Sequence, residues 1–268
     1  MKGRVDKSVG RRFFGEAPET YDAARPGHAN EVYEILRERC SVGTGSRVLE
    51  IGPGTGQATR RLLELGADPI VVVEPDPALA AHLRAALADR VDVRVTALED
   101  SELEPAAYDL AAAASSFHWV EEDVGLATIL RALRPGGWIA LWWTMFGDET
   151  RPDPFRQAID PLFDDIPHGP SGPTEDGKPS FALDSEARFA ALRAAGFEGP
   201  GHELFRWTRG WDTAGIRALY STFSPISVLE PGRRTDFLDS VARVAEVEFG
   251  GRVEKPLVTS LYLARRPF

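Results

Sequence analysis

The chain has 268 residues, with 31 Lys and Arg against 41 Asp and Glu, so its formal net charge is −10. This acidity argues against binding nucleic acid through its phosphates, and 43 % hydrophobic residues argue against disorder. The single cysteine, Cys40, excludes an intrachain disulfide and a thiolate zinc cluster. No apolar run reaches the ~18–20 residues of a bilayer span or forms a signal-peptide core, so we expect a cytoplasmic protein.

Five short apolar runs alternate with helical patterns in the first half of the chain: 47–51, 70–73, 91–95, 110–114 and 138–143. Nearly continuous apolar strands separated by helices predict a parallel sheet covered on both faces. Asn30 and Asp76 are placed to cap the helices that follow them, with Pro77 in the first helical position of the second. The segment 134–137, Arg-Pro-Gly-Gly, predicts the end of a helix and a turn into the fifth strand.

The second half of the chain begins with a change in composition. Between 147 and 179, eleven of thirty-three residues are Gly or Pro, which predicts loops and short helices. Apolar residues recur at helical spacing there, so we interpret the segment as a lid-like insertion that closes over the bound substrate. Helices over 185–195, 213–222 and 233–249 are predicted after it, with strands near 203–208 and 257–264.

The most informative stretch is 48–57, where an apolar strand enters a glycine-rich turn and a helix follows. Gly52, Gly54 and Gly56 permit positive φ and let a ligand approach the backbone, while the helix N-terminus offers unpaired N–H groups. Glu74 ends the next strand, where a carboxylate accepts hydrogen bonds from both hydroxyls of a ribose. The glycines alone are compatible with a tight turn without ligand. Together with Glu74 they predict a nucleoside-type cofactor.

The glycine spacing separates two cofactor classes. A dinucleotide fingerprint reads G-x-G-x-x-G, whereas this loop reads G-x-G-x-G, with Glu50 two positions ahead of it. This form resembles the first motif of class I S-adenosylmethionine (SAM)-dependent methyltransferases, and 97–99, 108–110 and 133–137 resemble the family's later motifs in the same order. Segments 21–26 and 116–120 are similar to the small-molecule group around trans-aconitate methyltransferase.

The resemblance implies an α/β fold: a doubly wound, seven-stranded, mostly parallel Rossmann-like sheet with its last strand antiparallel, plus an α-rich cap. We expect 1–45 to cover the cofactor site, 46–145 to form the SAM-binding core and 146–184 to form the lid-like insertion. The remainder, 185–268, would complete the sheet and supply cap helices over 213–249. Expected cofactor contacts lie in the loop, at the strand ends and near the N-terminus: Tyr21, Arg25, Glu50, Gly52, Gly54, Gly56, Glu74, Pro75, Leu98, Glu99 and Ser115.

Catalytic candidates follow from the chemistry of methyl transfer. Displacement at a sulfonium has an activated leaving group, so positioning dominates and a base is optional. His118 is the best candidate base, with a histidine hydrogen-bonded at a helix start as the alternative. Trp119, Trp143 and Tyr220 are candidate substrate contacts, although core packing explains Trp119 and helix-end chemistry explains the hydroxyls around Tyr220 equally well.

Two further charged groups have competing interpretations. Arg25 is expected either to pair with the carboxylate of the cofactor or to form a surface ion pair. Asp164 and Asp165 with His168 lie in the Pro/Gly-rich segment and are interpreted as solvated charge, so no metal is expected.

The predicted function is methyl transfer to a small-molecule acceptor, without nucleic-acid or membrane partners. Two alternatives stay open. One is a NAD-dependent oxidoreductase on the same general fold. The other is a protein that binds SAM as a regulatory module, or that uses the sulfonium for another alkyl transfer or a cyclisation. The cofactor motifs would look the same in these cases.

Overall fold

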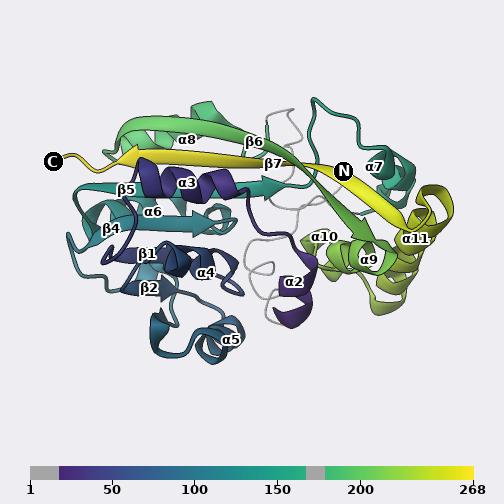
Figure 1. Cartoon of the computed structure of the whole chain (residues 1–268), viewed down its shortest axis with the longest axis horizontal. Helices are drawn as coiled ribbons and strands as arrows, with labels where there is room; N and C mark the ends of the chain where they lie inside the picture. The colour runs from purple at the N-terminus through teal and green to yellow at the C-terminus, as the bar shows by residue number, and fades with distance from the viewer. Residues whose placement is uncertain (1–17, 167–178) are drawn as a thin grey trace. The chain divides into compact units, whose positions relative to one another are not determined.

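The computed structural model describes residues 18–166 and 179–268. Seven strands form one sheet in the order β3-β2-β1-β4-β5-β7-β6 (Figure 1). Their bounds are β1 (Val48–Ile51), β2 (Ile70–Val73), β3 (Val91–Arg94), β4 (Tyr108–Ala114), β5 (Leu133–Met145), β6 (Glu198–Asp212) and β7 (Arg252–Arg265). The sheet is mostly parallel and β7 runs against β5, which confirms the predicted fold class.

The α-helices are α2 (Pro18–Ala24), α3 (Asn30–Glu38), α4 (Gln57–Glu64), α5 (Pro77–Leu87), α6 (Glu122–Ala132), α7 (Pro154–Ile159), α8 (Ser185–Ala194), α9 (Thr213–Ser221), α10 (Ser224–Ser227) and α11 (Pro231–Phe249). Short 3₁₀ turns include η3 (Leu98–Asp100), η4 (Phe117–Trp119) and η5 (Asp160–Phe163). No helix in the described part of the chain is long and apolar enough to cross a bilayer.

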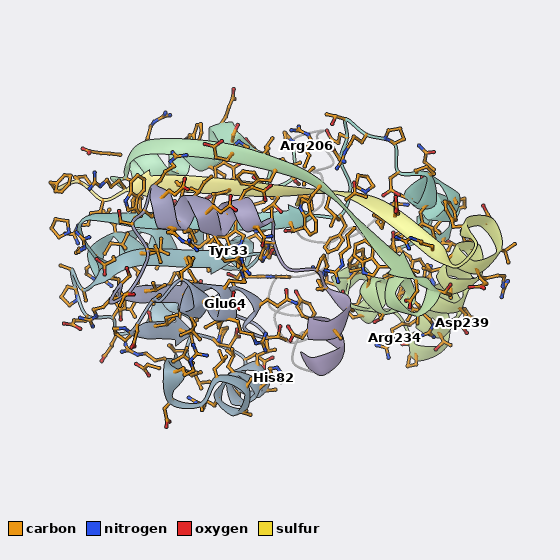
Figure 2. All side chains as sticks on the ribbon, in the orientation of Figure 1. Tyr33, Glu64, His82, Arg206, Arg234 and Asp239 are labelled. Carbon is orange, nitrogen blue, oxygen red and sulfur yellow. The ribbon has the colours of Figure 1, made fainter. Side chains whose placement is uncertain are left out.

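Every residue of β1 and β2 is buried, as expected for inner strands of a sheet covered on both faces. Val48 of β1 pairs with Ile70 of β2 and with Leu110 of β4, so both neighbours run alongside it in the same direction. Helices α3, α4 and α5 pack on one face through a core that includes Trp142. Tyr33, labelled on α3 in Figure 2, meets this indole edge-on, and their ring centroids lie 6.2 Å apart. Trp143, the next residue, faces the other side and is also buried.

Two local predictions about helix ends differ from the structure, and a third is confirmed. Asp76 caps α5 by accepting hydrogen bonds from the backbone N–H groups of Ala78 and Leu79. Asn30 does not cap α3, because it is already the first helical residue and its side-chain oxygen accepts a hydrogen bond from Arg61. Segment 134–137 does not precede the fifth strand but lies inside β5, because Leu133 already pairs with Tyr108 of β4. The register between the two strands shifts between Tyr108 and Leu110, where the pairing is irregular.

The described residues divide into two compact units. The sheet unit comprises 27–144, 179–205 and 259–268, and the helical unit comprises 18–26, 145–166 and 206–258. In the helical unit, Phe155 and Ile159 of α7 share a core with α9 and α11. The fully buried Lys255 lies in the same unit, with its Nζ 2.5 Å from Oδ2 of Asp153. Residues 146–166 of the predicted insertion therefore pack as an integral layer of the helical unit, whereas 179–184 belong to the sheet unit.

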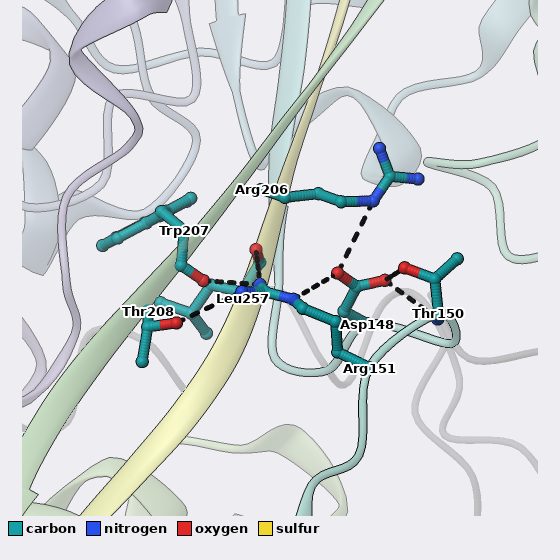
Figure 3. Close-up of polar contacts among 7 residues, drawn as sticks. All are labelled: Asp148, Thr150, Arg151, Arg206, Trp207, Thr208 and Leu257. Carbon is teal, nitrogen blue, oxygen red and sulfur yellow. Dashed lines mark hydrogen bonds and ion pairs between the residues drawn. The ribbon is translucent and has the colours of Figure 1, made fainter.

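Asp148 anchors the beginning of this insertion (Figure 3). Its carboxylate accepts hydrogen bonds from the backbone N–H and hydroxyl of Thr150 and from Nε of Arg151, and it lies 3.5 Å from Nε of Arg206. Arg151 then donates to the carbonyl oxygens of Trp207 in β6 and Leu257 in β7. Burial alone would raise the pKa of Asp148, but these hydrogen bonds and the Arg151 charge lower it to about 2.

We therefore expect Asp148→Asn to lower the free energy of unfolding at pH 7 by ~2 kcal/mol. The pKa of this carboxyl is lower in the folded chain than its ordinary value of 3.8, so its contribution is present above that value and is lost as pH falls toward 2. Urea unfolding of wild type and variant between neutral and acid pH measures this difference. Asp160→Asn, at an exposed position of the same segment, is the control. A constant difference across the acid range would contradict the electrostatic explanation.

Candidate active site

The glycine-rich loop leaves β1 in a left-handed conformation. Gly52 and Gly54 both have φ of +59°, and Gly56 has φ of +85° at the N-cap of α4. A Cβ on Gly52 would lie 2.7 Å from Cβ of Ser116, so this glycine allows the loop to approach the end of β4. At Gly54 a Cβ would have no heavy atom within 4 Å. The backbone at Gly54 therefore borders open space, where a ligand can approach it closely.

Glu74 lies beside this loop because it follows Val73, the residue paired with Ile51 in the parallel register. Its side chain is 4 % exposed. Oε2 accepts a hydrogen bond from the backbone N–H of Gly54 at 3.3 Å, and Oε1 accepts one from Asp76 at 3.0 Å. Two backbone N–H groups thus hold the carboxylate beside the loop.

Glu50 is the second carboxyl group near the loop, and it is completely buried. Neither of its oxygens has a hydrogen-bond partner among the described residues. Burial raises the pKa of Glu50 to about 7; the nearby Thr59 hydroxyl opposes this shift and the charge of Glu74 adds to it. A buried acid without a partner beside the loop fits a cofactor that brings a positive charge or a hydrogen-bond donor.

The expected adenine region lies after β3. Leu98 is 2 % exposed and packs toward α6, where its Cδ2 would lie 3.3 Å from a Cβ on Gly125. Glu99 accepts a hydrogen bond from the backbone N–H of Glu121 at 2.9 Å, so it supports the start of α6. Pro75 is exposed after Glu74. The side chains of Leu98 and Glu99 therefore support the first half of α6.

A group of aromatic side chains and one histidine follows β4. Ser115 has φ of +56°, and the next residue, Ser116, donates its hydroxyl to the carbonyl oxygen of Ile51 at the loop. These contacts place η4, and with it His118, at the same edge of the sheet as the glycine loop. Nε1 of Trp143 donates a hydrogen bond to Nδ1 of His118 at 3.0 Å.

The other rings complete this group. Trp119 is 9 % exposed, with its ring centroid 4.9 Å from that of His118. Phe181 lies 5.5 Å from Trp143 and 6.4 Å from His118. Phe181 was not predicted from the sequence, because it follows a Pro/Gly-rich segment and carries no motif that would single it out.

The remaining predicted site residues, which are Tyr21, Arg25 and Tyr220, lie in the helical unit. The Arg25 guanidinium lies over the rings of Tyr21, Phe146 and Phe223 at 5.0, 5.1 and 5.2 Å. It also donates to the hydroxyl and the carbonyl oxygen of Thr222. Arg25 therefore has a defined place within its own unit, with aromatic and hydroxyl partners.

Tyr220 was predicted to contact substrate, but its ring is only 1 % exposed and lies in the core of the helical unit. It shares one face of α9 with Ile216, four residues earlier, and that face is buried. Burial raises the pKa of the Tyr220 phenol. His168 lies outside the described residues, and within the described part no three His, Cys, Asp or Glu side chains gather as metal ligands would.

The strand order, the left-handed glycine loop and the carboxylate beside it define a class: a protein that binds a nucleoside-type cofactor on a Rossmann-like sheet. A family described as "methyltransferase domain" matches residues 49–141. An uncharacterized methyltransferase of Mycobacterium tuberculosis is 37 % identical over 130 residues, which cover 48 % of this chain and 51 % of that protein. The chain thus spans about half the length of the first curated relatives that it matches.

A second relative extends the match. An uncharacterized methyltransferase of Geobacillus kaustophilus is 31 % identical over 168 residues, which cover 57 % of this chain and 74 % of that protein. The chain belongs to the class I SAM-dependent methyltransferase family. This assignment favours SAM over the NAD alternative.

Solved structures with low sequence identity share the fold. Phosphoethanolamine N-methyltransferase 2 of Haemonchus contortus, in complex with phosphomonomethylethanolamine and S-adenosylhomocysteine, has a TM-score of 0.58 at 16 % identity, covering 98 % of this chain and 61 % of that one. The [4+2]-cyclase SpnF has a TM-score of 0.55 at 18 % identity, covering 100 % and 98 %. The same fold thus carries different reactions.

The buried Glu50 carboxyl predicts a pH dependence of stability. Its pKa is about 7 in the folded chain against an ordinary 4.5, so between these values the folded chain holds a proton that the unfolded chain releases. Stability should therefore fall by ~3 kcal/mol as pH rises through this window. Glu50→Gln should remove this fall, as measured by urea unfolding without cofactor. Glu64→Gln, exposed at the end of α4, is the control. Parallel pH profiles of wild type and Glu50→Gln would contradict this account.

Proposed function

We propose that the protein transfers the methyl group of SAM to a small-molecule acceptor. The observation that carries this proposal is the open backbone at Gly54 with the Glu74 carboxylate bound to its N–H. Glu74 would hold the ribose hydroxyls, and the loop from Gly52 to Gly56 would receive the methionine part. Glu50 would offset the positive charge that the cofactor brings. SAM supplies an activated methyl group, and the chain supplies binding, orientation and exclusion of water.

The net charge of the chain and two of its sequence segments support a small-molecule acceptor. A formal net charge of −10 is unfavourable for a polynucleotide substrate. The SAM-binding region alone does not decide the class, because a ribosomal RNA small subunit methyltransferase of Nocardia farcinica is 41 % identical over 87 residues, which cover 31 % of this chain. The segments 21–26 and 116–120, similar to the group around trans-aconitate methyltransferase, favour a metabolite.

Part of the predicted lid belongs to a buried core. The described part of 147–179 contributes Phe155 and Ile159 to the core of the helical unit, so deleting the segment would expose that core. The predicted closure over substrate stays a prediction, as do the predicted contacts of Tyr21 and Arg25 with the cofactor.

Glu74→Gln tests the cofactor site. Loss of the charged hydrogen bonds to the ribose should weaken SAM binding by about 1.5–3 kcal/mol, which is roughly 10- to 100-fold in Kd. Isothermal titration calorimetry with SAM and with S-adenosylhomocysteine measures the change, and circular dichroism verifies the fold. Glu64→Gln should leave the affinity unchanged. Unaltered affinity in folded Glu74→Gln would remove the ribose assignment.

Turnover tests the reaction. Incubation with methyl-labelled SAM and a panel of small metabolites should yield a labelled product heavier than its substrate by one methylene group, together with S-adenosylhomocysteine. Total RNA serves as the competing acceptor. Label that enters RNA alone would contradict the small-molecule proposal. A product formed without consumption of SAM would instead indicate a cyclase-type reaction on the same fold.

A further inference from the structure

Two buried carboxyl groups, Glu50 and Glu74, leave the same face of the sheet next to the glycine loop. Glu50 pairs with Val72 of β2 and Ala112 of β4, and Glu74 follows Val72 by two residues. Glu74 accepts hydrogen bonds from two backbone N–H groups, whereas neither oxygen of Glu50 has a hydrogen-bond partner among the described residues. Neighbouring buried carboxyl groups do not both ionise readily, and N–H donors stabilise the ionised form. The proton of this pair therefore resides on Glu50.

Within the described part of the chain, Glu50 forms no ion pair that would neutralise an ionised carboxylate. Thr59 of α4 brings a hydroxyl that lowers the pKa of Glu50, but this hydroxyl is itself buried without a hydrogen-bond partner among these residues. Tyr33 of α3 brings a phenol whose pKa is raised by burial and, to a smaller extent, by the charge of Glu50. The cation that acts on Tyr33 is Arg61, which lies 4.9 Å from the centre of its ring and pairs with the exposed Glu64. A positive charge brought by a ligand would therefore meet an uncompensated acid.

From this arrangement we infer that Glu50 senses the charge of the cofactor: its proton leaves when SAM binds and returns when the cofactor has become S-adenosylhomocysteine. The inference rests on the proposed methyl transfer and deepens it. SAM carries one more positive charge than S-adenosylhomocysteine, because its sulfur is a sulfonium and the product's sulfur is a neutral thioether. In the interior of a protein, a carboxylate responds to such a charge through space, without contact. Ionised Glu50 therefore favours SAM over the product of its demethylation.

Charges and protons balance over one turnover. A lone pair of the acceptor forms the bond to the methyl carbon, and the electrons of the broken C–S bond remain on sulfur, which becomes neutral. Glu50 releases its proton to water when SAM binds, and it takes a proton from water when only S-adenosylhomocysteine remains in the site. Glu50 exchanges no proton with the acceptor, so its effect is on the binding of the cofactor and on the release of the product.

The direction of the pH effect follows from linkage. Burial raises the pKa of Glu50 to about 7, and the charge of Glu74 raises it further, so the free site exchanges this proton near neutral pH. A bound positive charge lowers the pKa of the same carboxyl. SAM must therefore bind more tightly as pH rises toward 7, and the gain must level off above that value. Each unit by which SAM lowers this pKa corresponds to about tenfold in Kd between the two limits.

Isothermal titration calorimetry of the wild type tests the inference without a variant. Titrations with SAM and with S-adenosylhomocysteine, in two buffers of different ionisation enthalpy, give the number of protons released on binding. At pH 7 we expect SAM to release about half a proton from Glu50, because its pKa is about 7 in the free site. Between about pH 5.5 and 7.5 the Kd of SAM should fall roughly tenfold. The Kd of S-adenosylhomocysteine should change less, so the preference for SAM should grow with pH.

Glu50→Gln assigns the released proton. The amide cannot ionise, so this variant should lose the proton release and the growing preference for SAM, whereas Glu64→Gln on α4 should behave as the wild type does. The amino group of the ligand titrates near pH ~8 and contributes equally to every variant, so the difference belongs to Glu50.

Equal proton release by the wild type and Glu50→Gln would overturn the inference, and so would equal pH dependence for SAM and S-adenosylhomocysteine in the wild type. Methyl transfer by a protein whose SAM binding shows neither effect would contradict the inference alone. Failure of the folded wild type to bind SAM at any pH would contradict the proposed function, and the inference with it.

Discussion

The backbone hydrogen bond from Gly52 to the carbonyl oxygen of Val73, 2.9 Å long, joins the end of β1 to the end of β2. This bond places the start of the left-handed loop next to Glu74, the residue that follows β2. The backbone N–H of Gly54 then donates a hydrogen bond to the carboxylate of Glu74. The Ser116 hydroxyl ties the opposite side of the loop to the end of β4. A parallel register brings all three strand ends to one edge, so loop, carboxylate and histidine segment are adjacent by topology.

This arrangement places two carboxyl groups, Glu50 and Glu74, next to the loop in the absence of cofactor. Glu50 is buried without a hydrogen-bond partner among the described residues, and the neighbouring Glu74 raises its pKa further. A buried carboxyl group of this kind destabilises the folded chain unless a ligand supplies a hydrogen bond or a positive charge. Binding sites commonly contain such destabilising residues because they serve function. A cofactor that carries a positive charge would therefore stabilise the fold as it binds.

Aromatic packing surrounds the histidine segment. The Trp143 indole of β5 packs against Phe181 and Tyr262, and its N–H donates a hydrogen bond to Nδ1 of His118. A rigidly packed group of side chains suits the proposed methyl transfer, in which the leaving group is already activated and alignment accounts for much of the rate.

Periodicity and local chemistry were enough to predict the strand positions, the cap at Asp76 and the glycine loop with Glu74, because each depends on neighbours in the chain or on the parallel register. The sequence alone could not distinguish a core tyrosine from a substrate contact at Tyr220, since both occupy one face of a short helix. Nor could it show that Leu133 extends β5 or that Phe181 meets Trp143, because contacts between distant segments decide both. The partner of the His118 imidazole could not be predicted for the same reason, because only the folded chain places the N–H of Trp143 at its Nδ1.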